Sequence, residues 1–330
     1  MRISVIGDGG WGTALALVLH GNGHAVTVWG PDPDYVATIA AQRENVKFLP
    51  GIPLPDDLTW TADRPATIDG TDMVVLAVPS KFFRDVASSF AERFPTTVPV
   101  VSVSKGLDKT THRRMSQVAA DVLGCGPVAA LSGPSHAEEV ARGVPTAVAI
   151  ACEDHGQAER MQAAFSCNTF RVYTSDDVVG VELGGAMKNV IAIAAGVSDG
   201  IGFGDNTKAA LVTRGLAEGS RLGIALGAHP ATFAGLSGIG DLIVTCTSRL
   251  SRNRAVGEEL GRGRTLREIM NDMEQVAEGV WTCDTARALA ADAGVDVPIT
   301  DEVYAVVHEG KDPRAAVQSL LTRDPRAERE

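Results

Sequence analysis

Three glycines near the N-terminus constrain this chain most, because they follow a short apolar run and lead into a helix-forming one. The segment GDGGWG at residues 7–12 matches the pattern G-x-G-x-x-G and comes directly after Ile3–Ile6. In this context Gly7 makes a tight turn, Gly9 lets the backbone approach a diphosphate, and Gly12 allows close packing of helix on strand. The first amides of the helix then favour an anion. The pattern predicts a dinucleotide site.

Apolar runs alternate with helical patterns through the first half of the chain. Short runs that are apolar throughout are typical of strands buried in a parallel sheet with helices on both faces. We therefore expect an α/β, doubly wound parallel sheet of the Rossmann type in residues 1–178. The expected strands are Ile3–Ile6, Ala25–Trp29, Met73–Val78, Val98–Val103, Val128–Leu131 and Thr146–Ala151.

The second half, residues 179–330, shows helical periodicity without strand signals. We expect it to form an all-α C-terminal domain that binds substrate and carries the catalytic groups. The expected helices are Gly180–Ile201, Asn206–Leu226, Ala255–Leu260, Leu266–Met273, Thr282–Ala293 and Thr300–His308. A length of 330 residues agrees with two domains.

Composition excludes several classes of protein. The net charge of −11 opposes non-specific binding to nucleic acid or to anionic membranes. The five cysteines are widely spaced and never form a CxxC pair, so we expect neither a disulfide nor a metal site. We find no signal-peptide pattern and no apolar run of the roughly 18 residues that a membrane span needs. A cytoplasmic protein is expected.

The choice between NAD and NADP stays open. An acidic residue about 20 residues after the glycines holds the ribose of NAD in many such folds. Here Trp29-Gly30-Pro31 occupies the end of the second expected strand, and Asp32 and Asp34 come slightly late. No pair of arginines suggests a 2′-phosphate site.

Lys188 is the candidate acid/base. It lies among Val190, Ile191 and Ile193 on the expected helix, and apolar surroundings lower the pKa of a lysine. A lysine so tuned can give a proton to a carbonyl oxygen as hydride arrives. Gly184 and Gly185 lie one turn earlier on the same face. That bare face indicates either a ligand that approaches there or close helix packing with Lys188 directed to solvent.

Two further segments suggest phosphate and polyol chemistry. Ser251 is a candidate cap for the helix that follows, and Arg252 with the first helical amides is a candidate phosphate site. Taken alone, Arg252 and Arg254 are also compatible with solvated surface charges. Asp241, in SGIGDL at 237–242, is either a site residue or a simple helix cap.

The chain resembles the bacterial-type NAD(P)-dependent glycerol-3-phosphate dehydrogenases, whose helical domain is of the 6-phosphogluconate dehydrogenase-like kind. The resemblance covers nearly the whole chain in ordered blocks. These include GDGGWGTALA at 7–16, FLPGIPLP at 48–55, SKGL at 104–107, SGPSHAEEVARGVPTA at 132–147, ELGGAMKNVIA at 182–192, GIGDL at 238–242, TCTSRLSRNR at 245–254 and VAEG at 276–279.

The resemblance implies reversible hydride transfer between NAD(P)H and dihydroxyacetone phosphate, giving sn-glycerol 3-phosphate for phospholipid synthesis, and a possible homodimer. It implies catalytic roles for Lys188, Asn189, Asp241 and Thr245. The implied cofactor contacts are Gly7, Gly9, Gly10, Trp11, Gly12, Pro31, Phe48, Lys105, Ala137, Arg252, Val276 and Glu278. The implied substrate contacts are Lys105, Gly133, Ser135, Lys188, Asp241, Ser251, Arg252 and Asn253.

The chain departs from the family pattern at Gly10, Phe48 and His136, where Ser, Tyr and Phe are frequent, and Gly30-Pro31 replaces a frequent basic residue. The last change argues against strong NADP preference. The alternatives are a 3-hydroxyacid or 6-phosphogluconate-type dehydrogenase and a non-catalytic NAD(P)-binding sensor. GIGDL and SRNR argue against the first, and the joint presence of Lys188, Asp241, Arg252 and Asn253 against the second.

Overall fold

One sheet of eight strands organises the N-terminal half of the described chain, which comprises residues 1–273, 277–325 and 327–328. The strand order is β10-β9-β8-β7-β6-β1-β2-β5. The strands are β1 (Arg2–Ile6), β2 (Ala25–Trp29), β5 (Thr59–Thr61), β6 (Met73–Leu76), β7 (Val100–Ser102), β8 (Val128–Ser132), β9 (Thr146–Ala151) and β10 (Phe170–Ser175). The six predicted strands are all present, some with shorter bounds.

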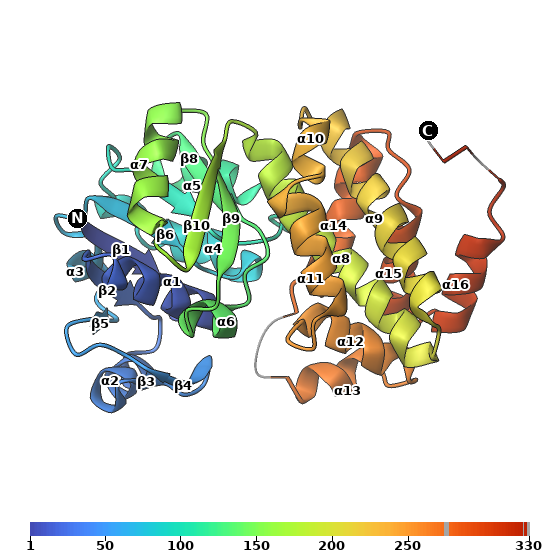
Figure 1. Ribbon diagram of the computed structural model, residues 1–330, viewed down its shortest axis with the longest axis horizontal. Coiled ribbons are helices and arrows are strands. Elements are labelled where there is room, and N and C mark those ends of the chain that lie inside the picture. The colour runs from blue at the N-terminus through green and yellow to red at the C-terminus, as the bar shows by residue number, and fades with distance from the viewer. Residues whose placement is uncertain (274–276, 326, 329–330) are drawn as a thin grey trace.

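Helices cover both faces of this sheet, as the doubly wound prediction requires (Figure 1). Alternate residues of a strand point to opposite faces. In β6, Val75 packs into the core with α1 (Gly10–Gly21), α2 (Pro33–Gln42) and α7 (His155–Phe165), whereas Val74 and Leu76 pack with α4 (Ser80–Ser88) and α5 (Met115–Leu123).

The sheet is not parallel throughout, which corrects the prediction at one edge. β8 pairs antiparallel with β9, while β9 and β10 pair parallel, so these last two strands run opposite to the rest. Thirteen residues, which include the short helix α6 (Ala137–Ala141), join β8 to β9. That length is near the lower limit for a parallel return, whose crossover needs a dozen or more residues and is usually a full helix, and α6 has only five residues.

Two strands of the sheet escaped prediction because they do not form continuous apolar runs. In β10, Phe170 and Val172 are buried while Arg171 and Tyr173 are exposed, the alternation of a half-covered edge strand. β5 has three residues. The hairpin of β3 (Glu44–Asn45) and β4 (Leu49–Pro53) lies outside the main sheet.

The chain is helical from Val178 onward, as predicted (Figure 1). α10 (Pro230–Phe233), α11 (Asp241–Thr247) and α16 (Pro313–Leu321) escaped prediction, as did the kinked turn at Leu236–Gly240, in which Gly238 is not helical. The helices are α8 (Val178–Ile201), α9 (Asp205–Ala225), α10 (Pro230–Phe233), α11 (Asp241–Thr247), α12 (Arg252–Gly261), α13 (Leu266–Asn271), α14 (Gly279–Asp292), α15 (Pro298–His308) and α16 (Pro313–Leu321).

Helix α8 is the axis of the second half. It is long and apolar enough to cross a membrane by composition, but 83% of its most apolar window is buried inside the protein, as expected of a core helix. α9, α11, α12 and α14 all pack on it. Since α8 also carries Lys188, its packing fixes the position of that side chain.

Close crossing of α8 and α12 depends on glycines. A Cβ built on Gly196 would overlap the carbonyl oxygen of Arg254, and one built on Gly257 would overlap that of Ile193. Gly200 and Gly261 make the same kind of approach one turn further on. The two backbones therefore meet directly, which holds the start of α12 beside the helix that carries Lys188.

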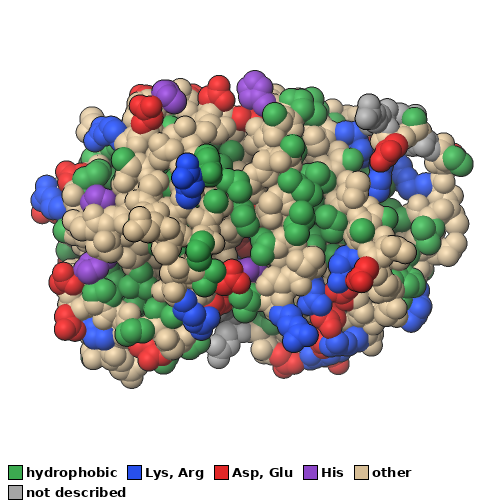
Figure 2. Space-filling model, in the orientation of Figure 1, with side chains coloured by type: hydrophobic (Ala, Val, Ile, Leu, Met, Phe, Trp, Pro, Cys, Tyr) green, Lys and Arg blue, Asp and Glu red, His purple; other side chains and the backbone are tan. Residues whose placement is uncertain are grey.

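Charged side chains on the face seen in Figure 2 are largely interleaved. Over α12 and α13 the figure shows blue and red side chains side by side. Arg262 pairs with Glu258 and Glu259, and Arg264 pairs with Glu259 and Asp272. These arginines belong to a mixed surface network.

Candidate active site

The glycine loop between β1 and α1 has the geometry that its motif predicts. Gly7 has a φ of 123°, and a Cβ there would lie 2.5 Å from the carbonyl oxygen of Ala77. A Cβ on Gly12 would overlap the carbonyl oxygen of Gly7 and lie 3.2 Å from the Ala77 Cβ. By contrast, no heavy atom of the described chain lies within 4 Å of a Cβ built on Gly9. The loop is therefore packed against the protein at Gly7 and Gly12 and open at Gly9.

Two of the predicted cofactor contacts, Phe48 and Ala137, lie beside Gly10 of this loop. A Cβ on Gly10 would lie 2.5 Å from the Phe48 carbonyl oxygen and 3.7 Å from the Ala137 Cβ. Pro31 follows β2 and is exposed. No side chain caps the first amides of α1. Those amides, with the open space at Gly9, fit a diphosphate.

A carboxylate bridges two lysines where the two halves of the chain meet. Asp241 Oδ2 lies 2.6 Å from the Nζ of Lys105, and Oδ1 lies 3.0 Å from the Nζ of Lys188. Lys105 follows β7, Lys188 lies in α8, and Asp241 begins α11. Thr245, one turn along α11, accepts a hydrogen bond of 2.9 Å from Lys188. Asp241 is therefore part of a charge cluster and not a simple cap.

Burial sets the electrostatics of this cluster. It lowers the pKa of Lys188 to about 8, although the Asp241 carboxylate opposes the shift. Burial alone would raise the pKa of Asp241, but Lys105 and Lys188 hold it below its usual value. The predicted direction for Lys188 is confirmed. The apolar neighbours of Lys188 did not predict its pairing with Asp241, which lies 53 residues away along the chain.

Lys105 ties this cluster to the N-terminal sheet. Its Nζ donates to the carbonyl oxygen of Gly133 at 2.8 Å and lies 3.4 Å from Ser135 Oγ. Gly133 and Ser135 directly follow β8. Three of the predicted substrate contacts are thus brought together by one ammonium group.

Two asparagines connect the cluster to α12 and α14. Asn253 Nδ2 donates to Asn189 Oδ1 at 2.9 Å, and Asn253 Oδ1 accepts from the backbone amide of Gly279 at 2.8 Å. Asn189 Nδ2 donates to the Lys105 carbonyl oxygen at 3.4 Å. These bonds fix the amide orientations beside Lys188.

The two arginines at the start of α12 have different surroundings. Ser251 caps the helix by accepting from the Arg254 amide, as predicted. Arg254 turns inward and pairs with Asp199 at 2.9 Å and with Glu258 at 3.2 Å. Arg252, the first helical residue, is exposed. Of the two arginines, Arg252 is the exposed candidate for a ligand at this helix terminus.

Glu278 lies at a second junction between the two halves. Its Oε1 accepts from the backbone amide of Ser80 at 3.0 Å, and a Cβ on Gly106 would lie 3.6 Å from its Oε2. Burial raises its pKa. Val276, the other predicted contact of this segment, lies outside the described residues.

Close packing explains Gly184 and Gly185. A Cβ on Gly184 would lie 2.6 Å from the Ser237 carbonyl oxygen, and one on Gly185 would lie 2.6 Å from Ser132 Oγ. Protein atoms therefore fill the face that a ligand was considered to approach. Lys188 nevertheless does not reach for solvent, because it is 9% exposed.

Several buried polar atoms have no hydrogen-bond partner among the described residues, and of their residues only Trp11 was predicted as a cofactor or substrate contact. The others include Ser132 Oγ, which lies against Gly185, Ser237 Oγ and His136 Nε2. Burial lowers the pKa of His136, and Lys188 lowers it further. Buried polar groups are normally paired, so such atoms often mark a ligand site. The substitution of His136 for a usual Phe was the available signal.

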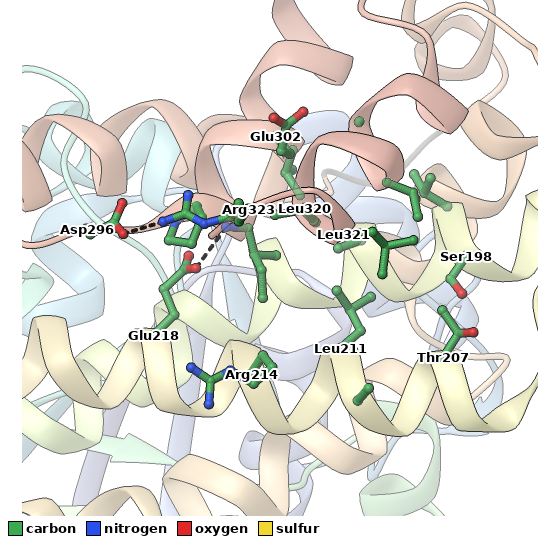
Figure 3. Close-up of a pocket in the computed structure, with 18 of the residues that line it drawn as sticks. Ser198, Thr207, Leu211, Arg214, Glu218, Asp296, Glu302, Leu320, Leu321 and Arg323 are labelled. Atoms are coloured by element: carbon green, nitrogen blue, oxygen red, sulfur yellow. Dashed lines mark hydrogen bonds and ion pairs between the residues drawn. The ribbon is translucent and has the colours of Figure 1, made fainter. Parts of the chain in front are cut away.

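A cavity of about 790 Å³ lies elsewhere, among α9, α15 and α16 (Figure 3). Some of its polar side chains are paired within the protein, whereas Ser198 Oγ has no hydrogen-bond partner among the described residues. Glu218 accepts from the Ile299 and Thr300 amides at the start of α15, and Arg323 pairs with Asp296 at 2.6 Å. None of the predicted site residues lines it.

A glycine-rich turn on a Rossmann-type sheet, joined to a helical domain that presents a buried lysine, defines an NAD(P)-dependent dehydrogenase of the two-domain kind. The comparisons name the family. Models of the N-terminal and C-terminal domains of NAD-dependent glycerol-3-phosphate dehydrogenase match residues 2–158 and 177–318. The chain belongs to the glycerol-3-phosphate dehydrogenases and is an NAD(P)-dependent oxidoreductase.

Individual relatives agree over the full length. The chain is 50% identical to glycerol-3-phosphate dehydrogenase [NAD(P)+] of Geobacillus kaustophilus, over 99% of this chain and 96% of the relative. It is 51% identical to that of Geobacter metallireducens, over 99% of each. The crystal structure of glycerol-3-phosphate dehydrogenase from Coxiella burnetii superposes with a TM-score of 0.94 at 39% identity, over 98% of this chain and 99% of that one.

Proposed function

We propose that the Lys188 cluster reduces dihydroxyacetone phosphate to sn-glycerol 3-phosphate, reversibly, with Lys188 as the acid/base. The observation that carries the proposal is a buried ammonium group with a pKa near 8, held by Asp241 and Thr245 where the two halves of the chain meet. A catalytic acid works best with a pKa near the working pH. NAD(P)H, when bound, supplies the hydride.

Lys188 is the group that moves the proton. Its Nζ gives a proton to the carbonyl oxygen as that oxygen gains charge, and takes it back in the reverse direction. Asp241, buried and ionised, keeps the amine oriented through the 3.0 Å contact. Lys105 pairs with the second carboxylate oxygen of Asp241. Two ammonium groups share one carboxylate, so the cluster has a net positive charge that stabilises a developing alkoxide.

Arg252 and the first amides of α12 are suited to the phosphate of the substrate. A guanidinium beside a helix terminus combines a charged fork with amide donors. Asn253 of α12 donates to Asn189 at 2.9 Å, and Asn189 donates to the Lys105 carbonyl oxygen at 3.4 Å. We assign them, with Ser251, Gly133 and Ser135, to positioning the substrate.

The cofactor would be held by the loop Gly7–Gly12 and the start of α1, with Phe48, Ala137 and Pro31 at its border. The open space at Gly9 and the uncapped amides support this assignment. Lys105 and Glu278 lie where the two halves of the chain meet, and Arg252 begins α12 in the helical half. We assign these three residues to the part of the cofactor that lies farthest from the glycine loop. Val276 is assigned there by resemblance alone.

We further propose a cytoplasmic homodimer that supplies phospholipid synthesis. All five cysteines are free, and four of them are buried, which suits a reducing compartment. The dimer is inferred from the family. Light scattering on the purified protein would measure its mass directly.

The decisive assay is oxidation of NADH or NADPH when dihydroxyacetone phosphate is added, followed by absorbance. Rapid oxidation is expected, with no reaction of 6-phosphogluconate and oxidised cofactor. A folded protein that oxidises neither cofactor would favour the sensor, and activity with 6-phosphogluconate would favour the other dehydrogenase.

A further inference from the structure

We infer that Asp8, the residue between the first two motif glycines, is the group that selects the adenosine ribose of the cofactor and disfavours a 2′-phosphate. The inference rests on the assignment of the cofactor to the Gly7–Gly12 loop. It concerns a residue that neither the motif nor the end of β2 would single out.

The carboxylate of Asp8 fills the space in which a side chain at the end of β2 would stand. β2 ends at Trp29, and the next residue, Gly30, is buried. A Cβ on Gly30 would lie 2.8 Å from the Asp8 carboxyl carbon and closer still to Oδ2. In Rossmann folds that bind NAD, the acid at the end of the second strand accepts from the ribose 2′-hydroxyl. Here the acid comes from the glycine loop, and Gly30 leaves room for it.

The Asp8 carboxylate is available for a ligand. Asp8 is 8% exposed, and the hydrogen bonds that other described residues make to Asp8 go to its backbone carbonyl oxygen and not to its carboxylate. Its backbone carbonyl, by contrast, is held by Asn45 Nδ2 at 2.7 Å. The loop is therefore anchored through its main chain while the carboxylate is left for another partner.

The neighbouring charges favour a hydroxyl over a phosphate. Asp32 and Lys47 are the charged groups that interact electrostatically with the Asp8 carboxylate. Asp32 accepts from the amides of Asp34 and Tyr35 at the start of α2, so it is already used as a cap. The Lys47 Nζ lies over the Phe48 ring, 5.1 Å from its centre. The carboxylates of Asp8 and Asp32 outnumber the single exposed ammonium group of Lys47. The rim formed by these three side chains is therefore negative, and it repels a 2′-phosphate dianion.

Binding of nucleotides in the absence of substrate tests the inference without relying on turnover. Calorimetry would compare NADH with NADPH, and AMP with adenosine 2′,5′-bisphosphate, on the full chain. The unmodified protein is expected to bind NADH about 10- to 100-fold more tightly than NADPH, the range for a hydrogen bond to a charged group. Asp8→Ala should weaken NADH, strengthen NADPH and bring the ratio close to one.

Asp34→Ala is the matched control, because it removes an exposed carboxylate from the first turn of α2 without changing the charged groups that act on Asp8, and it should leave the ratio unchanged. If Asp8→Ala melts early, Asp8→Asn keeps the shape and carries the same expectation for NADPH. Preference for NADPH in the unmodified protein, or an unchanged ratio in both Asp8 variants, would overturn the role of Asp8. Failure to bind any of the four nucleotides would instead overturn the loop as the cofactor site.

Discussion

Lys188 Nζ and Asp241 Oδ1 lie 3.0 Å apart although their helices meet only in the folded protein. The pair joins the long core helix α8 to the first residue of α11. Since Asp241 also contacts Lys105 at 2.6 Å, one carboxylate orients both lysines.

Lys188→Met should lower kcat by about 100- to 10,000-fold, the usual contribution of a positioned acid or base. Methionine keeps most of the buried volume and removes the proton. NADH affinity should stay the same, since the proposed diphosphate loop lies on the other half of the chain. Lys109→Met, at an exposed position, is the control. Near-normal turnover of Lys188→Met would refute the assignment.

The two directions of the reaction should depend on pH in opposite ways. Burial places the pKa of Lys188 near 8, so the ammonium form dominates below that pH and the neutral amine above it. Ketone reduction needs the ammonium form, and its kcat should fall as pH rises through about 8. Oxidation of glycerol 3-phosphate should rise over the same interval. Profiles without any inflection there would contradict the role of Lys188.

Asp241→Asn should shift the inflection of the reduction profile to lower pH. The Asp241 carboxylate raises the pKa of Lys188 against the effect of burial, and asparagine removes that charge. At neutral pH less of the lysine would then carry a proton, so kcat should fall. A merely structural role for Asp241 would lower kcat without moving the inflection.

Arg252→Ala should raise the KM for dihydroxyacetone phosphate about 10- to 100-fold, as expected when a hydrogen bond to a charged group is lost. The effect on kcat should be smaller, because the guanidinium is assigned to the phosphate and not to the carbonyl. Arg249→Ala, exposed just before α12, should leave KM unchanged. Equal KM values for the two variants would move the phosphate site elsewhere.

Gly257→Ala should destabilise the protein although alanine favours a helix by about 1 kcal/mol. Its Cβ would overlap the Ile193 carbonyl oxygen, and overpacking costs about 1–3 kcal/mol. The midpoint of urea unfolding should therefore fall. Gly21→Ala is the control, because no heavy atom of the described chain lies within 4 Å of a Cβ there. An unchanged midpoint for Gly257→Ala would show that α8 and α12 can separate at little cost.

Features that depend on neighbours in sequence were predicted well. The turn at Gly7, the strands of the sheet interior, the long helices α8 and α9 and the cap at Ser251 each follow from periodicity or local backbone geometry. Half-exposed strands such as β10 were missed, because their alternation is weaker than a continuous apolar run. The reversed direction of β9 was also missed, since strand direction depends on the path of the connection.

By itself the sequence determined the order of the elements, the glycine loop and the choice of Lys188. Only the tertiary structure decided which charges meet: Asp241 contacts Lys188 from a neighbouring helix and Lys105 across the junction, and the Asp8 carboxylate lies beside Gly30. It also decided that Gly184 is a packing glycine. The physical reason is that burial and electrostatic pairing act through space, between groups whose separation along the chain carries no signal.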